Sequence, residues 1–101
     1  FNQRYESQNG EMKCASLITS PAFEKMLQQF LRKNSKLEQK LAKILDVLKR
    51  DPFHPSLKTH KLHGELSRFY ACSINLVYRI VFSADNEVVV LYGIGSHDEV
   101  Y

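Results

Sequence analysis

One strand-forming run in this sequence carries a charge that needs an explanation. Arg79 lies within LVYRIVF, and the alternation of side chains in a strand puts it on the opposite face from Tyr78 and Ile80. A guanidinium offers paired donors to phosphate oxygens, so one interpretation of Arg79 is an anion clamp. The alternative is a solvent-facing arginine that pairs with a nearby carboxylate such as Asp98.

The chain closes with YGIGSHDEVY, where a predicted strand gives way to a polar cluster. Gly95 and Ser96 permit a sharp exit from the strand and leave His97 at the end of the sheet. Imidazole titrates near neutral pH, which suits proton transfer to or from a ribose hydroxyl or a leaving oxygen. The alternative is a histidine that only caps the turn. Tyr101 either orients a phosphate or stacks on a base, or it tucks into the core as a terminal aromatic.

A loop predicted over residues 52–64 holds three histidines and two lysines. The pattern H-x5-H-x2-H is a weak indication of zinc, because cysteines and a regular helix are absent, so no metal and no other cofactor are expected. Lys58, His60 and Lys61 are interpreted instead as a basic lip beside the sheet. The sequence has no P-loop, dinucleotide-binding or lipidation pattern.

Length and composition point to one soluble domain. A chain of 101 residues with 44% hydrophobic and 25% charged residues is ordinary for a globular protein. No apolar run approaches the roughly 20 residues of a membrane span, and the polar start FNQRYESQNGE does not resemble a signal peptide. We therefore expect a cytoplasmic protein without a membrane partner. Cys14 and Cys72 form no CxxC motif and are predicted to be buried in strands.

The positive charge is concentrated in the middle of the chain. The formal net charge is only +3, but residues 25–61 contain ten Lys and Arg against three Asp and Glu. Such a surplus attracts a polyanion by counterion release, which favours nucleic acid as a partner. A lysine-rich helix that is merely solvated would show the same pattern, so charge alone leaves both interpretations open.

The elements that must position these residues are two helices and a sheet. Residues 13–19 predict a strand, after which Ser20 and Pro21 suit the cap and first position of a helix of about 12 residues. A capping box formed by Ser35 and Glu38 predicts the start of a second helix, which Asp51-Pro52 ends. The apolar stripes of the two helices consist of Phe23, Met26, Leu27, Phe30 and Leu31, and of Leu37, Leu41, Ile44, Leu45 and Leu48.

Three further strands are predicted after the loop, over residues 68–74, 76–83 and 87–94, with a turn at 84–86 between the last two. The order β-α-α-β-β-β predicts an α+β two-layer sandwich, in which the helix pair packs on a small, mainly antiparallel sheet. We assign residues 12–101 to this single domain. Residues 1–11 are interpreted as a flexible leader or an expression remnant.

Three segments together resemble a known family. LKTHKLHGEL, SINLVYRIVF and GIGSHDEVY are similar to the RelE/ParE superfamily of toxins from bacterial toxin–antitoxin systems, in particular to its RelE-like and YafQ-like mRNA interferases. The resemblance covers about residues 12–101. It implies a small, metal-independent endoribonuclease that cuts mRNA on the ribosome and is silenced by a cognate antitoxin. Operator DNA would be bound only through the toxin–antitoxin complex.

The resemblance also implies roles for individual residues. Arg79 matches the arginine of the YR strand motif, which binds the scissile phosphate, and His97 in GSH matches an acid–base catalyst after the last strand. Tyr101 resembles a terminal aromatic that contacts the substrate. In THKLHG, His60 and Lys61 correspond to a segment that brings a histidine or lysines to the site, and Lys58 would support the RNA backbone beside them.

Two other functions are compatible with the same fold. A ParE-like protein would bind DNA gyrase without cleaving RNA, although such a binder has no need of the GSHDEVY cluster. An inactive antitoxin-binding module is the second alternative, because residues 73–75 read SIN where YafQ-like relatives often carry a further histidine and aspartate near the middle strands. Translational arrest, filamentation with DNA damage, or unimpaired growth on production of the chain alone would distinguish the three.

Overall fold

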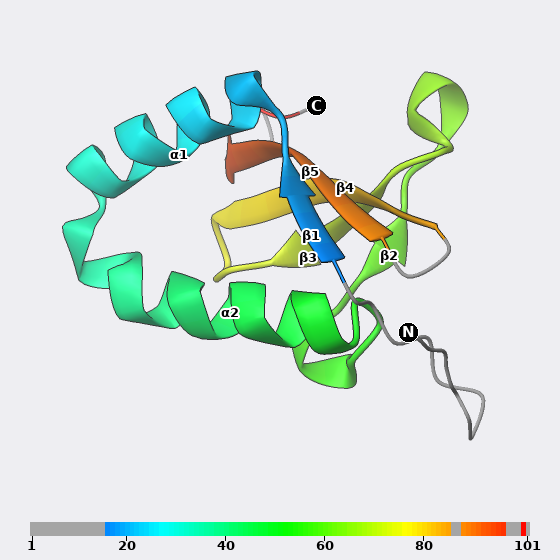
Figure 1. Cartoon of the computed structure of the whole chain (residues 1–101), viewed down its shortest axis with the longest axis horizontal. Coiled ribbons are helices and arrows are strands. Elements are labelled where there is room, and N and C mark those ends of the chain that lie inside the picture. The colour runs from blue at the N-terminus through cyan, green and yellow to red at the C-terminus, as the bar shows by residue number, and fades with distance from the viewer. Residues whose placement is uncertain (1–15, 86–87, 97–99, 101) are drawn as a thin grey trace.

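The computed structural model describes residues 16–85, 88–96 and 100. Figure 1 shows two helices on one side of a twisted sheet. The helices and strands are β1 (Ser16–Thr19), α1 (Pro21–Lys33), α2 (Glu38–Arg50), β2 (His60–Lys61), β3 (Tyr70–Ser73), β4 (Tyr78–Asp85) and β5 (Val88–Ser96). Three single turns of 3-10 helix are η2 (Ser35–Leu37), η3 (Pro55–Leu57) and η4 (Gly64–Leu66). No described helix is long and apolar enough to cross a membrane.

The start of α1 follows the sequence prediction. Ser20 is extended, with φ −79° and ψ 157°, and its hydroxyl accepts a hydrogen bond from the Phe23 amide at 3.0 Å, while Pro21 occupies the first helical position. At the other end, the Asn34 side chain and backbone amide both donate to the carbonyl of Phe30. Both ends of α1 therefore carry a cap hydrogen bond, and its 13 residues match the predicted length closely.

The predicted capping box of the second helix is wrong. Ser35 begins the 3-10 turn η2, and α2 starts three residues later at Glu38 with Leu37 as its N-cap. Neither start has a side-chain cap hydrogen bond. The tight connection from α1 leaves Ser35 inside a turn with helical backbone, so its hydroxyl does not occupy the extended cap position that a capping box requires.

The sheet has five strands in the order β1-β5-β4-β3-β2. β1 is parallel to β5 and the other neighbours are antiparallel, which confirms the predicted mainly antiparallel sheet. The prediction of a plain loop over residues 52–64 is wrong, because this segment contains η3 and the edge strand β2. A strand of two residues is too short to produce a period-two pattern, so no periodicity could predict it.

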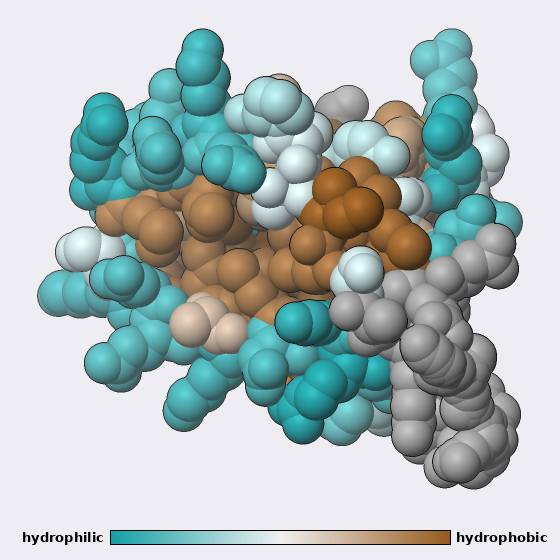
Figure 2. All heavy atoms as spheres, viewed as in Figure 1, coloured by the Kyte–Doolittle hydropathy of each residue, from teal (hydrophilic) through white to brown (hydrophobic). Residues whose placement is uncertain are grey.

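The hydrophobic core lies between the helices and one face of the sheet. Phe23 and Leu48 from the helices are fully buried against Ile80 and Phe82 of β4 and their neighbours. The Phe30 ring packs edge-on to Tyr78, with 4.9 Å between ring centroids, and so joins α1 to the start of β4. Figure 2 shows hydrophobic residues gathered between α1 and α2 and hydrophilic ones on the outer sides of both helices. Both stripes face inward as predicted.

The other face of the sheet is covered only in part. Ala71 and Val81 are buried there under Leu62, with Leu66, Phe69 and Val100 packed around them. This smaller cluster covers the middle of the sheet. Beyond it, towards the start of β4, Ser73 and Arg79 are half-buried on the face that carries no helix, and Gly95 beside them is buried.

The beginning of β4 differs from the prediction. Leu76 and Val77 were expected in a strand, but they form an exposed turn, and β4 starts at Tyr78. The side chain of Asn75 accepts hydrogen bonds from the amides of Val77 and Tyr78 at 2.9 and 2.8 Å. These bonds close the turn and fix the point at which β3 reverses into β4. Within β4 itself the side chains alternate as predicted, so Arg79 and Ile80 lie on opposite faces of the sheet.

Replacing Leu48 by alanine should test the core. Leu48 is fully buried at the end of α2, so Leu48→Ala is expected to lower the free energy of unfolding by about 2–5 kcal/mol. Leu76→Ala removes the same atoms from a residue that is 96% exposed and should change it by no more than about 0.5 kcal/mol. Urea unfolding followed by circular dichroism measures both; equal effects would contradict this core.

Candidate functional site

Arg79 lies on the face of the sheet that carries no helix, near the start of β4. It pairs with Ser73 of β3 on one side and with Gly95 of β5 on the other. The residue is half-buried, and its Nε atom is inaccessible to solvent. Gly95 is buried and places no side chain beside Arg79. The central strand thus presents a partly desolvated guanidinium, which strengthens its interaction with an anion.

The last strand ends at this same end of the sheet. Tyr78 pairs with Ser96 and Arg79 with Gly95, so β5 ends next to the start of β4. The candidate residues His97 and Tyr101 lie outside the described residues, as does Asp98, the carboxylate considered as a partner of Arg79. The described strands bring the chain to Ser96, which precedes His97 in the sequence and pairs with Tyr78, the residue before Arg79.

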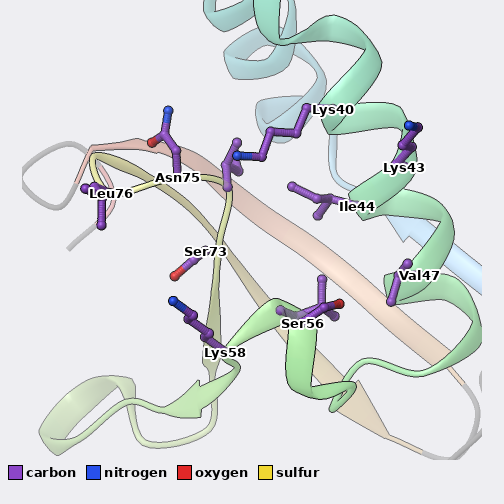
Figure 3. Close-up of a pocket in the computed structure, with 11 residues that line it drawn as sticks. Lys40, Lys43, Ile44, Val47, Ser56, Lys58, Ser73, Asn75 and Leu76 are labelled. Atoms are coloured by element: carbon purple, nitrogen blue, oxygen red, sulfur yellow. The ribbon is translucent and has the colours of Figure 1, made fainter.

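Lys58 lies beside Ser73, the strand partner of Arg79. Lys58 ends η3 with a left-handed backbone, φ 52° and ψ 40°, and its amide donates to the Pro55 carbonyl at 3.1 Å. Figure 3 shows the Lys58 ammonium directed towards the Ser73 hydroxyl. Ser73 is also the strand partner of Arg79, so this serine adjoins both predicted cationic residues, Lys58 and Arg79. The bond from the Thr59 hydroxyl to the Pro52 carbonyl, 2.7 Å long, anchors this segment.

His60 and Lys61 point to opposite faces of the sheet. His60 pairs with Ala71 and therefore shares the face of Arg79, whereas Lys61 pairs with Tyr70, whose ring packs on the helix side. Two strand spacings and a two-residue offset place the Cα atoms of His60 and Arg79 about 12 Å apart. The sheet therefore brings His60 to the same surface as Arg79 but not into contact with it, and it does not bring Lys61 there.

The other two loop histidines have local structural surroundings. The Nδ1 atom of His54 lies 2.8 Å from the Ser56 hydroxyl and accepts a hydrogen bond from the Ser56 amide, which caps η3. His63 is exposed and precedes η4. Among the residues that the structure describes, no group of three or more His, Cys, Asp or Glu side chains is arranged to hold a metal ion.

A groove beside the site was not predicted from the sequence. It lies between α2, η3 and the end of β3, has a volume of about 480 Å³ and is called the α2–β3 groove below. Figure 3 shows Lys40 and Lys43 on its α2 side and Lys58 with Ser73 on the opposite side. Its lining consists of Lys40, Lys43, Ile44, Val47, Ser56, Leu57, Lys58, Ser73, Ile74, Asn75 and Leu76. In the sequence, these lysines could not be told from those of a solvated helix face.

Cys72 is excluded as a nucleophile by its surroundings. It precedes Ser73 in β3 but points to the opposite face, where it is 1% exposed within the core beneath the helices. Burial raises the pKa of its thiol from 9.0 to about 12, and a hydrogen bond with the backbone of Ile80 acts weakly in the opposite direction. This confirms the predicted buried cysteine in a strand; Cys14 lies outside the described residues.

Solved structures similar to this one include bacterial toxins. A metal-bound toxin from Helicobacter pylori is 27% identical with a TM-score of 0.71, the match covering 85% of this chain and 98% of that one. YafQ from E. coli strain BL21(DE3) is 15% identical with a TM-score of 0.70, covering 81% of this chain and 92% of that one. A YoeB/ParE toxin from Agrobacterium tumefaciens is 18% identical with a TM-score of 0.70, covering 85% and 99%. The fold is thus that of RelE-like toxins.

The sequence defines the family more closely. The model of the YafQ family, described as a bacterial toxin of type II toxin–antitoxin systems, matches residues 15–101. No curated protein matches the chain significantly. The chain therefore belongs to the YafQ family of type II toxins, which confirms the resemblance seen in its three segments.

Thiol labelling should test the burial of Cys72. The experiment uses a Cys14→Ser variant, in which Cys72 is the remaining cysteine. At mildly alkaline pH the raised pKa reduces the thiolate fraction of Cys72 about a thousandfold. The thiol of the folded protein should therefore react with a disulfide reagent at least a thousandfold more slowly than the thiol of the denatured protein. The stability contributed by the neutral thiol is complete below pH 9 and is lost as the pH rises towards 12. Rapid labelling of the folded protein would contradict the structure.

Proposed function

We propose that this toxin is an endoribonuclease that cleaves mRNA on the translating ribosome in the cytoplasm. The observation that carries the proposal is the position of Arg79, half-buried on the face of the sheet that carries no helix, between Ser73 and Gly95, which is one residue before the end of β5, after which His97 follows in the chain. Membership of the YafQ family supports it. A single arginine in this place suits the binding of one phosphodiester group.

The proposed chemistry is an internal transfer within the RNA. The 2′-oxygen forms a bond to the adjacent phosphorus while the bond from phosphorus to the 5′-oxygen breaks, and one proton moves from the attacking hydroxyl to the leaving oxygen by way of the enzyme. This reaction needs positioning, a proton carrier and stabilisation of the charge that develops on the phosphoryl oxygens. No metal or other cofactor takes part in the proposed step.

Each candidate residue has one part in this reaction. Arg79 donates to the phosphoryl oxygens, and His97 carries the proton as general acid or base. Tyr101 orients the substrate. Lys58 beside Ser73 and His60 on β2 bind the RNA backbone on either side of the scissile group, since they lie on the same surface at different distances from Arg79. Lys61 remains a candidate for a backbone contact outside this surface, because it faces the helix side.

We further propose that a cognate antitoxin binds this toxin and silences it. E. coli YafQ has been solved in a DinJ–YafQ toxin–antitoxin complex, and a YoeB–YefM complex is known from Staphylococcus aureus. The match to the DinJ–YafQ complex covers 84% of this chain with a TM-score of 0.69 and 16% identity. Contact with operator DNA is proposed to occur only through the toxin–antitoxin complex.

Removal of the Arg79 guanidinium should abolish most cleavage. Arg79→Ala is expected to reduce the rate of mRNA cleavage on purified translating ribosomes by about 100- to 1,000-fold, because a preorganised donor to the developing charge is lost. Arg50→Ala is the control, since Arg50 is exposed and pairs with Asp46 at the far end of α2. Equal activity of a folded Arg79→Ala protein and wild type would remove Arg79 from the mechanism.

Loss of the His97 imidazole should also slow the reaction. His97→Ala is expected to lower cleavage by about 100-fold or more, the usual range for a general acid or base. His63→Ala provides a matched loss of an exposed histidine and should leave the rate unchanged. Growth of cells that produce each variant gives a second reading: arrest of translation by wild type supports the nuclease, whereas filamentation with DNA damage would support gyrase inhibition instead.

A further inference from the structure

The α2–β3 groove combines an aliphatic floor with an exposed apolar edge. Ile44 and Val47 of α2 face Leu57 and Ile74 across it, and the lining contains no aromatic residue. Leu76, at the edge, is 96% exposed, and the next residue, Val77, is 55% exposed. Leaving apolar surface in water is unfavourable, and contiguous exposed patches of this kind mark interaction sites.

The rim of the groove is positively charged. Lys40 and Lys43 stand one turn apart on α2, and Lys58 stands opposite them on the segment after η3 (Figure 3). All three lysines are exposed, and no lining residue carries a carboxylate. Three like charges around an apolar hollow repel one another, and an occupant that brings carboxylates would relieve this repulsion.

RNA and an acidic peptide are both negatively charged, but only the peptide matches the aliphatic floor of the groove. RNA would satisfy the lysines, yet unpaired bases stack on aromatic side chains, and this lining has none. A peptide segment with acidic and aliphatic residues on one face satisfies both the rim and the floor. A volume of about 480 Å³ lies within the range of pockets that bury such side chains. The chemistry therefore favours a peptide over a nucleic acid.

We propose that the α2–β3 groove is the docking site for an acidic, amphipathic segment of the antitoxin, which inserts aliphatic side chains between Ile44 and Ile74 and pairs carboxylates with Lys40, Lys43 and Lys58. This inference rests on the antitoxin partner of the proposed function but not on nuclease activity. A segment in the groove covers Lys58 and Ser73, the strand partner of Arg79. Docking would therefore close the site from one side without requiring contact with His97.

The test compares the affinity of the purified cognate antitoxin for toxin variants at physiological salt. The double variant Lys40→Glu/Lys43→Glu should weaken antitoxin binding by about 100-fold, because two attractive pairs become repulsive. Leu76→Asp should weaken it by about tenfold through loss of apolar contact and added repulsion. These positions are exposed, so circular dichroism should show an unchanged fold. Lys36→Glu/Lys49→Glu reverses the same number of charges outside the groove and should retain the wild-type affinity.

The antitoxin affinity relative to this control decides the inference. A loss of tenfold or more in the groove double variant supports it, whereas equal losses in the two double variants would reduce the effect to net charge and overturn it. If the groove double variant binds antitoxin like wild type but no longer cleaves mRNA, the groove serves RNA and the inference is also overturned. Wild type that binds antitoxin without cleaving RNA would refute the nuclease proposal alone, and wild type that fails to bind antitoxin would refute the partner.

Discussion

The pairing of β4 with both of its neighbours is the constraint on which the rest of this structure depends. Through one register, Arg79 is held between Ser73 and Gly95, while Ile80 and Phe82 on the opposite face enter the core beneath the helices. A shift of one residue would bury the arginine and expose the core residues, so the burial of Ile80 fixes the orientation of Arg79. Stability and the candidate site are thus set by the same hydrogen-bond ladder.

The two layers have separate contributions to function. The helices contribute the apolar surface that holds β4 in place, and α2 adds the lysines on one side of the α2–β3 groove. The opposite face of the sheet presents Arg79 and His60, and the end of β5 leads to His97. Because Ser73 both pairs with Arg79 and lines the groove, substrate and antitoxin would compete for adjoining surfaces. This proximity offers a direct physical route from antitoxin binding to inhibition.

The sequence predicted features that depend on long periodic patterns. The stripes of both helices and the alternation around Arg79 identified the layers and the correct face of β4. It failed where structure depends on a few residues: β2 has only two, and the Ser35 capping box gave way to a 3-10 turn set by the tight helix connection. The α2–β3 groove was missed because its lysines come from segments far apart in the chain. The roles of His97 and Tyr101 rest on family resemblance and remain predictions.

The central claim is that Arg79 binds a phosphodiester undergoing attack by its neighbouring 2′-hydroxyl. The ends of mRNA fragments released from translating ribosomes by the wild-type toxin test it most directly, by mass spectrometry of the 3′ ends and mapping of the 5′ ends. We expect 2′,3′-cyclic phosphates, or the monophosphates formed from them, paired with 5′-hydroxyl ends. Fragments with 3′-hydroxyl and 5′-phosphate ends would contradict the account, because water would then be the nucleophile, and an absence of new ends would contradict cleavage itself.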